Sequence, residues 1–305
     1  MPVPPEVRRA FERRVDEILR QADRMTEEAV RRALELAEQT RREILDRLSS
    51  LPEGSFSARH LRGLREGLDR AIAGLVGRYQ REVRDLLERA HELGIDLGEE
   101  PLKLAALASR SAGQVVPAGV VPRQTLEVLQ DYSAELITRI GEEARARINS
   151  VLAQGALGVV SPHEAIRRIA GALPDASVFR SIGLRAETIY RTEAGRVLSA
   201  AAEVRMGQMA DRLPRMRKQW VAVMDARTRP THAAAHGQIV GAREQFVVGG
   251  YLARFPRDPY LPAGESISCR CWAIPVIDDD VIADLSAGRA GSGVSPAARA
   301  GLAAE

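Results

Sequence analysis

The hydrophobic positions of the first half of the chain recur every three to four residues over long stretches. Between Pro5 and Leu48 they include Phe11, Val15, Ile18, Ala22, Met25 and Ala29. Arginine and glutamate fill most of the other positions, and this spacing gathers the apolar side chains on one face of an α-helix. After a break at 52–55, a second stripe runs from Leu61 to Leu93. We predict two long amphipathic helices that pair as an antiparallel hairpin within residues 1–115.

Glycines occur in two groups along the second stripe. Four of them lie inside it, namely Gly63, Gly67, Gly74 and Gly77. Each lowers helix stability by about 1 kcal/mol relative to alanine, and we interpret them as sites of close helix packing or of a bend. Gly94 and Gly98 come next and are followed by Pro101, and we predict that these three residues end the helix.

The middle of the chain also has helical periodicity. Apolar positions predict one helix from Arg123 to Leu152 and another from Leu184 to Met209. Ser161, Pro162 and Glu164 form a helix start of the capping-box type between them. We predict that these helices serve mainly to pack the structure.

The period changes to that of a β-strand at Lys218–Met224. Further short strand patterns follow at 239–240, 245–248 and 271–277. We therefore predict a predominantly α-helical N-terminal region with a long hairpin, followed by a small α+β C-terminal domain with an antiparallel sheet. The predicted boundaries are 1–115 for the hairpin, 123–277 for the second domain, and 278–305 for a short helix and disordered tail.

Composition narrows the class of protein only slightly. The 305 residues include 4% aromatic residues and carry a formal net charge of +3, so the core should be aliphatic and the charge does not by itself indicate nucleic-acid binding. No stretch has the length and apolarity of a signal peptide or a membrane helix. We expect a protein made and kept in the cytosol.

Residues that can bind metal are concentrated near the C-terminal end. His232 and His236 are four positions apart, which on a helix would place both rings on one face, and Cys269 and Cys271 would point to the same side of a strand. Two thiolates and two imidazoles form the donor set of a tetrahedral structural zinc site. The alternative is that the cysteines are small buried side chains and the histidines hydrogen-bond across a loop.

The same pattern gives little support for an enzyme. No glutamate adjoins the first histidine to act as a general base, and four protein ligands would leave no position for a water molecule. Neither cysteine has an oxyanion-hole glycine motif beside it, and the chain contains no phosphate-binding loop or dinucleotide fingerprint. We predict a protein without catalytic residues.

A polar turn connects the first strand to the histidines. Asp225 begins the sequence Asp-Ala-Arg-Thr-Arg-Pro and can accept hydrogen bonds from the backbone amides that follow it. Thr228 or Thr231 can cap the short helix that carries the histidines. Arg227 is interpreted either as a binding site for phosphate or an acidic surface, or as part of a solvated turn.

The order of these motifs resembles the phage Mu F-like minor head protein family. The resemblance rests on Asp-x-Arg-Thr-Arg-x-x-His, on His-Gly, on Pro-Ala-Gly-Glu before Cys-Arg-Cys, and on the upstream triplet Arg191-Thr192-Glu193. It covers roughly residues 186–275. We interpret Arg191 and Glu193 as a helix-face ion pair that orients the domain. Two positions depart from the family pattern: Ser268 replaces the usual Asn, and His236 stands where Asp is frequent.

The resemblance implies a minor capsid protein of a tailed bacteriophage that acts in head morphogenesis. Such proteins are associated with the portal vertex and act in head assembly, DNA packaging or ejection, in several copies per virion. Its expected partners are the portal oligomer and packaged DNA, with no membrane in the mature head. The alternatives are a zinc-stabilised nucleic-acid-binding protein and a metal-dependent hydrolase.

Overall fold

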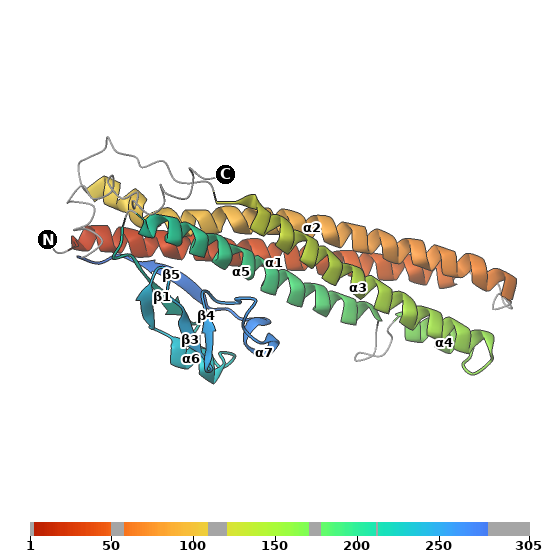
Figure 1. The fold of residues 1–305 in the computed structure, drawn as a ribbon. Helices are drawn as coiled ribbons and strands as arrows, with labels where there is room; N and C mark the ends of the chain where they lie inside the picture. Colours follow the sequence, from red (N-terminus) through yellow and green to blue (C-terminus); the bar gives the residue numbers. More distant parts are fainter. Residues whose placement is uncertain (1–2, 50–57, 109–120, 171–177, 212, 280–305) are drawn as a thin grey trace, which may run out of the picture. The chain divides into compact units, whose positions relative to one another are not determined.

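The computed structural model describes residues 3–49, 58–108, 121–170, 178–211 and 213–279. It confirms a largely helical chain with small antiparallel sheets near its C-terminal end (Figure 1). The chain folds into two compact units. Unit 1 comprises Met1–Asp23, Arg89–Arg123 and Gly195–Glu305, and unit 2 comprises Arg24–Glu88 and Gln124–Ala194.

The two long helices form and run antiparallel. Helix α1 spans Pro5–Ser49 and helix α2 spans Ala58–Ala108. Within unit 2 the Tyr79 hydroxyl donates to the Ala33 carbonyl, whereas Arg47, further along α1, donates to the carbonyl of Gly67, earlier in α2. Residue numbers therefore increase in opposite directions along the two helices, which are antiparallel as the periodicity predicted.

Helix α2 continues beyond the point where we predicted that it ends. It passes through Gly94, Gly98 and Pro101 and stops only at Ala108. In unit 1 a Cβ atom at Gly94 would lie 2.3 Å from the carbonyl oxygen of Leu198 on α5, and one at Gly98 would lie 2.6 Å from the Cβ of Arg205. These glycines let α2 and α5 pack closely, and the helix continues through them despite their low helix propensity.

The four earlier glycines of α2 have no such role. A Cβ at Gly63 would meet nothing within 4 Å. At Gly67, Gly74 and Gly77 it would meet only the guanidinium end of an arginine at 3.6–3.8 Å. The interpretation of this group as sites of close helix packing was therefore wrong, and the alternative that they permit a bend stays a prediction.

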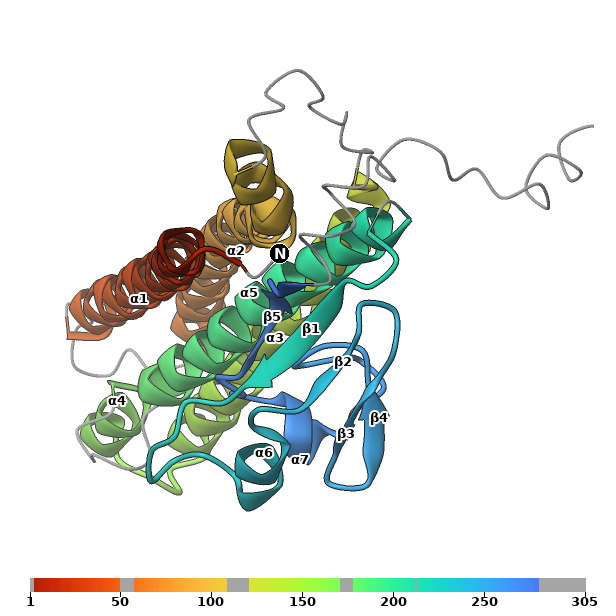
Figure 2. The same ribbon diagram turned by 90° about the vertical axis from the view of Figure 1, so that its left-hand side faces the viewer.

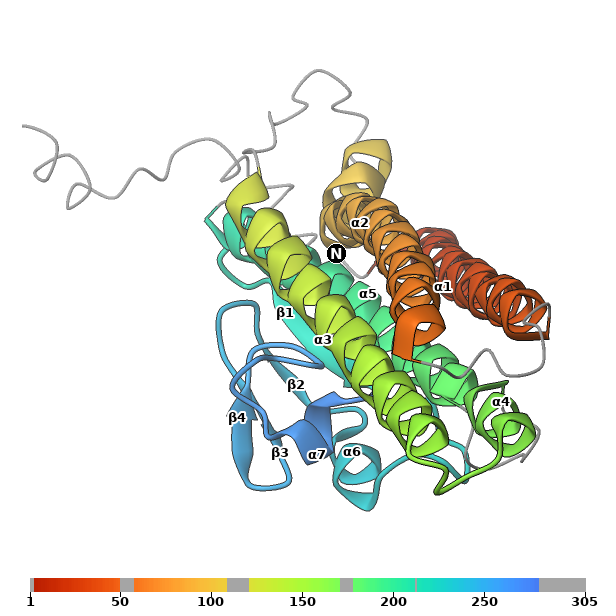
Figure 3. The same cartoon turned by 90° about the vertical axis from the view of Figure 1, so that its right-hand side faces the viewer.

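Unit 2 is a packed set of helices. It contains α3 (Arg123–Ala156) from Gln124 onward, α4 (Pro162–Ala170) and the first part of α5 (Val178–Ala210), beside parts of α1 and α2 (Figures 1 and 3). The Tyr190 hydroxyl donates to the buried carbonyl of Tyr79, which joins α5 to α2. Gln80 donates to Thr138 and so joins α2 to α3. The Ser161 hydroxyl accepts from the Glu164 amide, as the capping motif predicted.

The strands belong to unit 1 and form two antiparallel sheets. One has the order β2-β1-β5, from Ile239–Gly241, Arg217–Val221 and Trp272–Val276 (Figure 2). The other pairs β3 (Phe246–Val248) with β4 (Tyr251–Ala253). The central strand β1 pairs Trp220 with Ala273 of β5, and the Trp220 side chain is fully buried in a hydrophobic cluster that includes Phe246. The predicted mainly antiparallel sheet is confirmed.

Strand β4 was not predicted. Its signal is the Gly249-Gly250 pair, since both residues have positive φ angles (59° and 84°) and form a two-residue hairpin turn in which Val248 pairs with Tyr251. The sequence Tyr-Leu-Ala that follows is short, and two of its three side chains are exposed. It therefore lacks the clear alternation by which a strand is recognised.

A buried ion pair supports the first sheet. Lys218 of β1 is fully buried and places its Nζ 2.7 Å from both carboxylate oxygens of Glu203, while it also donates to the carbonyl of Arg254. Burial lowers the pKa of Lys218 and raises that of Glu203. The mutual contact satisfies two charges that would be costly to bury alone.

The predicted domain boundaries at 115, 123 and 277 remain a prediction, because the two units are each assembled from several separate segments. The predicted helix and disordered tail at 278–305 lie almost wholly outside the described residues. Among the described helices, none combines the length and the apolar character required to cross a membrane.

Candidate metal centre

His232 is held by the short helix that follows β1. Helix α6 spans Pro230–Ala235, with Pro230 in its first turn and Arg229 at its N-cap. No side chain caps this helix, so the caps predicted from Thr228 or Thr231 are absent there. His232 is 1% exposed and meets the ring of Trp220 edge-on, with 5.7 Å between ring centroids. The helix thus directs this imidazole into the core of the sheet.

The cysteines come from the loop that enters β5. Strand β5 begins at Trp272, so Cys269 and Cys271 precede it, and the prediction that both lie in a strand was wrong. Both thiols are free and buried, with 4% and 2% exposure. Ser268, before them, has a φ of 55°, a left-handed conformation that Asn adopts more readily than Ser.

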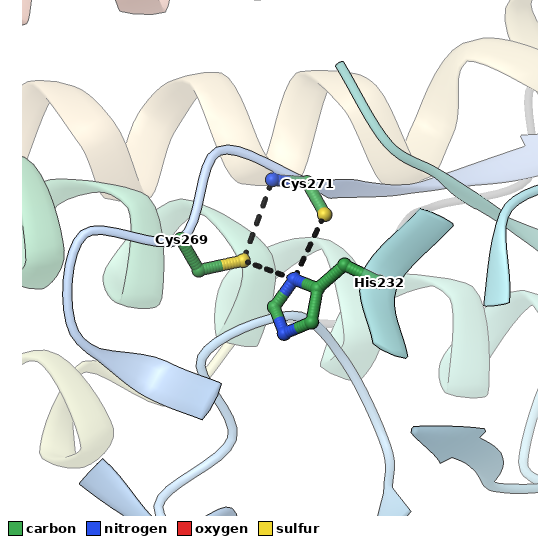
Figure 4. Close-up of side chains that lie close together, drawn as sticks. All are labelled: His232, Cys269 and Cys271. Atoms are coloured by element: carbon green, nitrogen blue, oxygen red, sulfur yellow. Dashed lines mark hydrogen bonds between the residues drawn. The ribbon is translucent and has the colours of Figure 1, made fainter. Parts of the chain in front are cut away.

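Three donor atoms converge in this core. Nδ1 of His232 lies 3.2 Å from Sγ of Cys271 and 3.5 Å from Sγ of Cys269, and all three atoms lie within 4.8 Å of one another (Figure 4). The backbone amide of Cys271 also donates to Sγ of Cys269. His232, Cys269 and Cys271, which we call the His/Cys group, can therefore hold a metal ion.

His236 is not part of the His/Cys group. Helix α6 ends at Ala235, and His236 is its C-cap with extended backbone angles (φ −56°, ψ 132°). The four-residue spacing therefore no longer places the two rings on one face. The His236 side chain is exposed, and its Nδ1 accepts the backbone N–H of Ala222. The structure brings together three of the four predicted ligands.

A carboxylate faces the other nitrogen of His232. Glu265, in the short helix α7 (Ala263–Ser266), places Oε2 2.8 Å from Nε2 of His232. The same oxygen accepts the hydroxyl of Thr231, at 2.9 Å, which fixes the carboxylate in place. A carboxylate this close favours the tautomer with the proton on Nε2, although the two groups are not aligned for a hydrogen bond. That tautomer leaves Nδ1 free to bind a metal.

The cysteine loop is held from inside by Arg257. Its guanidinium donates to the carbonyls of Cys269 and Cys271 at 2.8 and 3.2 Å and lies over the ring of Trp272. Burial lowers the pKa of Arg257, although the two neighbouring cysteines oppose this shift. A Cβ at Gly195 would lie 2.3 Å from the Arg257 Cζ, so glycine at that position makes room for the guanidinium.

The cysteine loop is held from outside by Asp225. Arg270 lies between the two cysteines in the sequence. Its two terminal nitrogens donate hydrogen bonds to the Asp225 carboxylate, at 2.7 and 2.5 Å. Asp225 also accepts the amide of Arg227, as the predicted turn requires, and Thr228 donates to it. The Arg270 ion pair holds the pKa of Asp225 well below its usual range. In the sequence Asp225 and Arg270 belong to separate motifs, and the structure joins them.

The two cysteine thiols shift each other's pKa in opposite directions. Interaction with the Cys271 thiol lowers the pKa of Cys269, helped by His232 and the positive charge of Arg257. The same interaction raises the pKa of Cys271, and burial adds to that rise. One thiolate and one thiol in an apolar core form an environment in which a cation would be strongly stabilised.

The donor set fits a zinc ion. Zn–S and Zn–N bonds of about 2.3 and 2.0 Å in a tetrahedron put neighbouring ligand atoms roughly 3.5 Å apart. The two N···S distances of 3.2 and 3.5 Å are close to this value. Sulfur and imidazole donors favour zinc over the harder magnesium or calcium ions.

The upstream pair has a structural role in unit 2. Arg191 forms a bidentate ion pair with Glu27, at 2.8 and 3.0 Å. It also donates a hydrogen bond to Glu187 of its own helix. Arg191 thus forms ion pairs with Glu27 and Glu187, whereas the prediction had named Glu193 as its companion. Glu193 is 2% exposed and lies inside the unit.

We expect Glu265→Gln to weaken zinc binding by about 10- to 100-fold, the usual effect of removing a carboxylate that orients a ligand histidine. The amide keeps the size of the side chain but loses the charge that fixes the tautomer of His232. Competition with a chromophoric chelator measures the affinity.

The matched control is Glu244→Gln, because Glu244 accepts the Gly241 amide at the surface of the same unit, away from the His/Cys group. Unchanged zinc affinity in Glu265→Gln would show that Glu265 does not orient His232.

Sequence reasoning missed Glu265, Arg257 and Gly195. Glu265 belongs to the Pro-Ala-Gly-Glu motif, which was used only for its resemblance, and its distance of 33 positions from His232 gives no local signal. Arg257 carries the charge of an ordinary surface residue, and nothing in the sequence shows that it is buried. Gly195 is recognisable only from the atoms that fill the space beside it.

Residues 164–274 match the family described as Phage Mu protein F like protein. The minor head protein GP7 of Bacillus phage SPP1 is 32% identical over 99 residues, which cover 32% of this chain and 31% of GP7. The uncharacterized protein YqbB of Bacillus subtilis (strain 168) is 25% identical over 184 residues, 59% of this chain and 57% of YqbB.

A third relative is named as an enzyme. It is the NAD(+)--arginine ADP-ribosyltransferase EFV of Enterococcus faecalis (strain ATCC 700802 / V583), 36% identical over 90 residues, which cover 30% of this chain and 18% of that protein. For all three relatives the aligned part is less than two thirds of the relative's own length. No solved structure matches the chain.

Proposed function

We propose that this chain, whose residues 164–274 match the Phage Mu protein F like family, is a minor structural protein of a phage head that acts in head morphogenesis. The observation that carries the proposal is that the matched segment contains Asp225, Arg270 and the complete His/Cys group, together with Glu265. The likeness to a protein named minor head protein supports the same conclusion.

We further propose that the chain associates with the portal oligomer inside the virion, in several copies, and acts in assembly, DNA packaging or ejection. This follows from the family resemblance. The chain would be made in the host cytoplasm before it joins the head.

The portal proposal is tested by co-sedimentation with purified portal rings. We expect the full chain to sediment with the rings in a saturable manner, and we expect mass spectrometry to find it in purified virions. A chain that stays in the supernatant at all ring concentrations, and is missing from virions, would contradict the proposal.

Packaged DNA is a second proposed partner. The net charge of +3 favours at most weak, salt-sensitive binding. Fluorescence anisotropy against salt concentration distinguishes this from the alternative of a dedicated nucleic-acid-binding protein. Tight binding that falls steeply with salt would favour the alternative, and negligible binding at moderate salt would exclude it.

We propose that the protein is not an enzyme and that one zinc ion braces its small sheets. The alignment with the relative named as an enzyme covers only 18% of that protein, so we do not assign its activity to this chain. The brace is supported by the donors themselves: His232 comes from α6, and both thiols come from the loop before β5. A metal bound between them ties one side of the core to the other.

The zinc proposal is tested by metal analysis of the full chain purified under reducing conditions. We expect about one zinc per chain and a lower unfolding temperature after chelation. A fully folded protein that contains no zinc and takes up none would contradict the brace. It would leave the proposed role in the phage head standing, because that role rests on the matched segment.

A further inference from the structure

We infer that the metal centre takes three ligands from the chain and a fourth, exchangeable ligand from solution, of the class of small monodentate donors such as water or hydroxide. The inference rests on the proposed zinc site and changes its type. The sequence had suggested four protein ligands and hence a closed site. The tertiary structure supplies one imidazole and two cysteine sulfurs.

The first reason is the position of His236. Its backbone amide donates to the Ala233 carbonyl at the end of α6, and its Nδ1 accepts the amide of Ala222. The ring is exposed, whereas the three members of the His/Cys group are all at least 96% buried. To become a ligand, His236 would have to give up a backbone hydrogen bond and turn from the surface into the core.

The second reason is the position of Glu265. Its carboxylate contacts Nε2 of His232, whereas the sulfur atoms contact Nδ1 of the same ring. The two nitrogens point in diverging directions, so an ion held between Nδ1 and the sulfurs is on the opposite side of the ring from this carboxylate. Glu265 is also held by Thr231. It acts through His232 as a positioning residue.

The third reason is that other donors nearby already have partners. The carbonyls of Cys269 and Cys271 accept hydrogen bonds from Arg257. Among the described residues, no further histidine, cysteine, aspartate or glutamate joins the group of three. The two cysteines are the only ones in the sequence, so a third thiolate cannot come from this chain.

Three ligands of the types Cys, Cys and His leave one position of a zinc tetrahedron for a ligand from outside, whereas structural zinc sites are saturated by four protein ligands. The burial of the group limits this ligand to a few atoms. Within the described segments no further acid or histidine joins the group, and Glu265 lies on the far side of His232. We therefore assign to this site a structural metal ion that exchanges its fourth ligand with solution, and we assign no chemical reaction to it.

The test uses X-ray absorption at the zinc edge on the full chain, with the wild type and His236→Ala compared. We expect two sulfurs, one imidazole and one light oxygen-type ligand in both proteins, with the same zinc content. Two imidazoles in the wild type and one in His236→Ala would overturn the inference, since His236 would then be the fourth ligand.

Cobalt substitution tests the exchange itself. We expect cyanide to shift the visible bands of the Co²⁺-loaded wild type and of His236→Ala at similar concentrations. Bands that cyanide leaves unchanged would overturn the inference and would indicate a fourth ligand supplied by the protein, for example a carboxylate from the segment 280–305. A chain that binds neither zinc nor cobalt would refute the zinc proposal itself, an outcome distinct from a metal-loaded protein with a closed site.

Discussion

His232→Ala is expected to abolish stoichiometric zinc binding and to unfold the small sheets at a much lower temperature than in the wild type. The substitution removes the only imidazole of the His/Cys group and leaves two buried thiols without their nitrogen partner. Deleting a large buried side chain costs on the order of 2–5 kcal/mol through the cavity alone. Loss of the metal adds to this, because the binding energy of a structural zinc is also folding energy.

Two measurements separate the metal from the cavity. Zinc per chain, by mass spectrometry, should fall from about one to background in His232→Ala. Thermal unfolding should then show that a chelator lowers the transition temperature of the wild type and has no further effect on the variant.

The matched control is His236→Ala, four positions along the chain. That side chain is exposed and accepts a hydrogen bond from a single backbone amide, so the variant should keep its zinc and most of its stability. A His232→Ala protein with normal zinc content and an unchanged transition would show that the group is not a metal centre.

Gly94→Ala is expected to destabilise the protein by about 1–3 kcal/mol, the typical cost of overpacking a close contact. The new methyl group would lie 2.3 Å from the Leu198 carbonyl oxygen and 2.7 Å from the Ala201 Cβ. A backbone carbonyl within a helix cannot turn aside, so α2 and α5 must separate locally within unit 1. This cost exceeds the gain of roughly 1 kcal/mol that alanine brings to a helix.

The control for this prediction is Gly207→Ala in α5, also in unit 1. A Cβ there would meet nothing within 4 Å, so only the helix-propensity gain of about 0.5–1 kcal/mol should remain. Urea unfolding should therefore shift the two midpoints in opposite directions. A midpoint for Gly94→Ala at or above that of the wild type would show that the two helices are not in tight contact at this position.

The amount that sequence could predict differs from feature to feature. The periodicity of α1 and α3 gave their starts and their lengths to within a few residues, because helix formation and burial of one face are local properties. The glycines of α2 were misjudged in both groups. Gly94 and Gly98 were expected to end the helix and instead allow α5 to approach it, while Gly63 and Gly67 have open space or a flexible side chain beside them.

The candidate site shows the same division. His232, Cys269 and Cys271 were chosen correctly as a group, because residues of these types are rare in this chain and are concentrated near its end. His236 was added on the assumption that the helix continues. Whether it does depends on where the chain must turn to enter β2, which only the folded structure shows.

Thus the sequence by itself determined the long helices, the change to strands at Lys218 and the donor atoms available for a metal. Tertiary structure decided which of those donors meet. It brought Glu265 to His232, placed Arg257 beneath the cysteine loop in the space left by Gly195, and joined Asp225 to Arg270. The reason is physical: periodicity and capping act over a few neighbouring residues, whereas these contacts join segments 12 to 62 positions apart, whose approach depends on how the whole core packs.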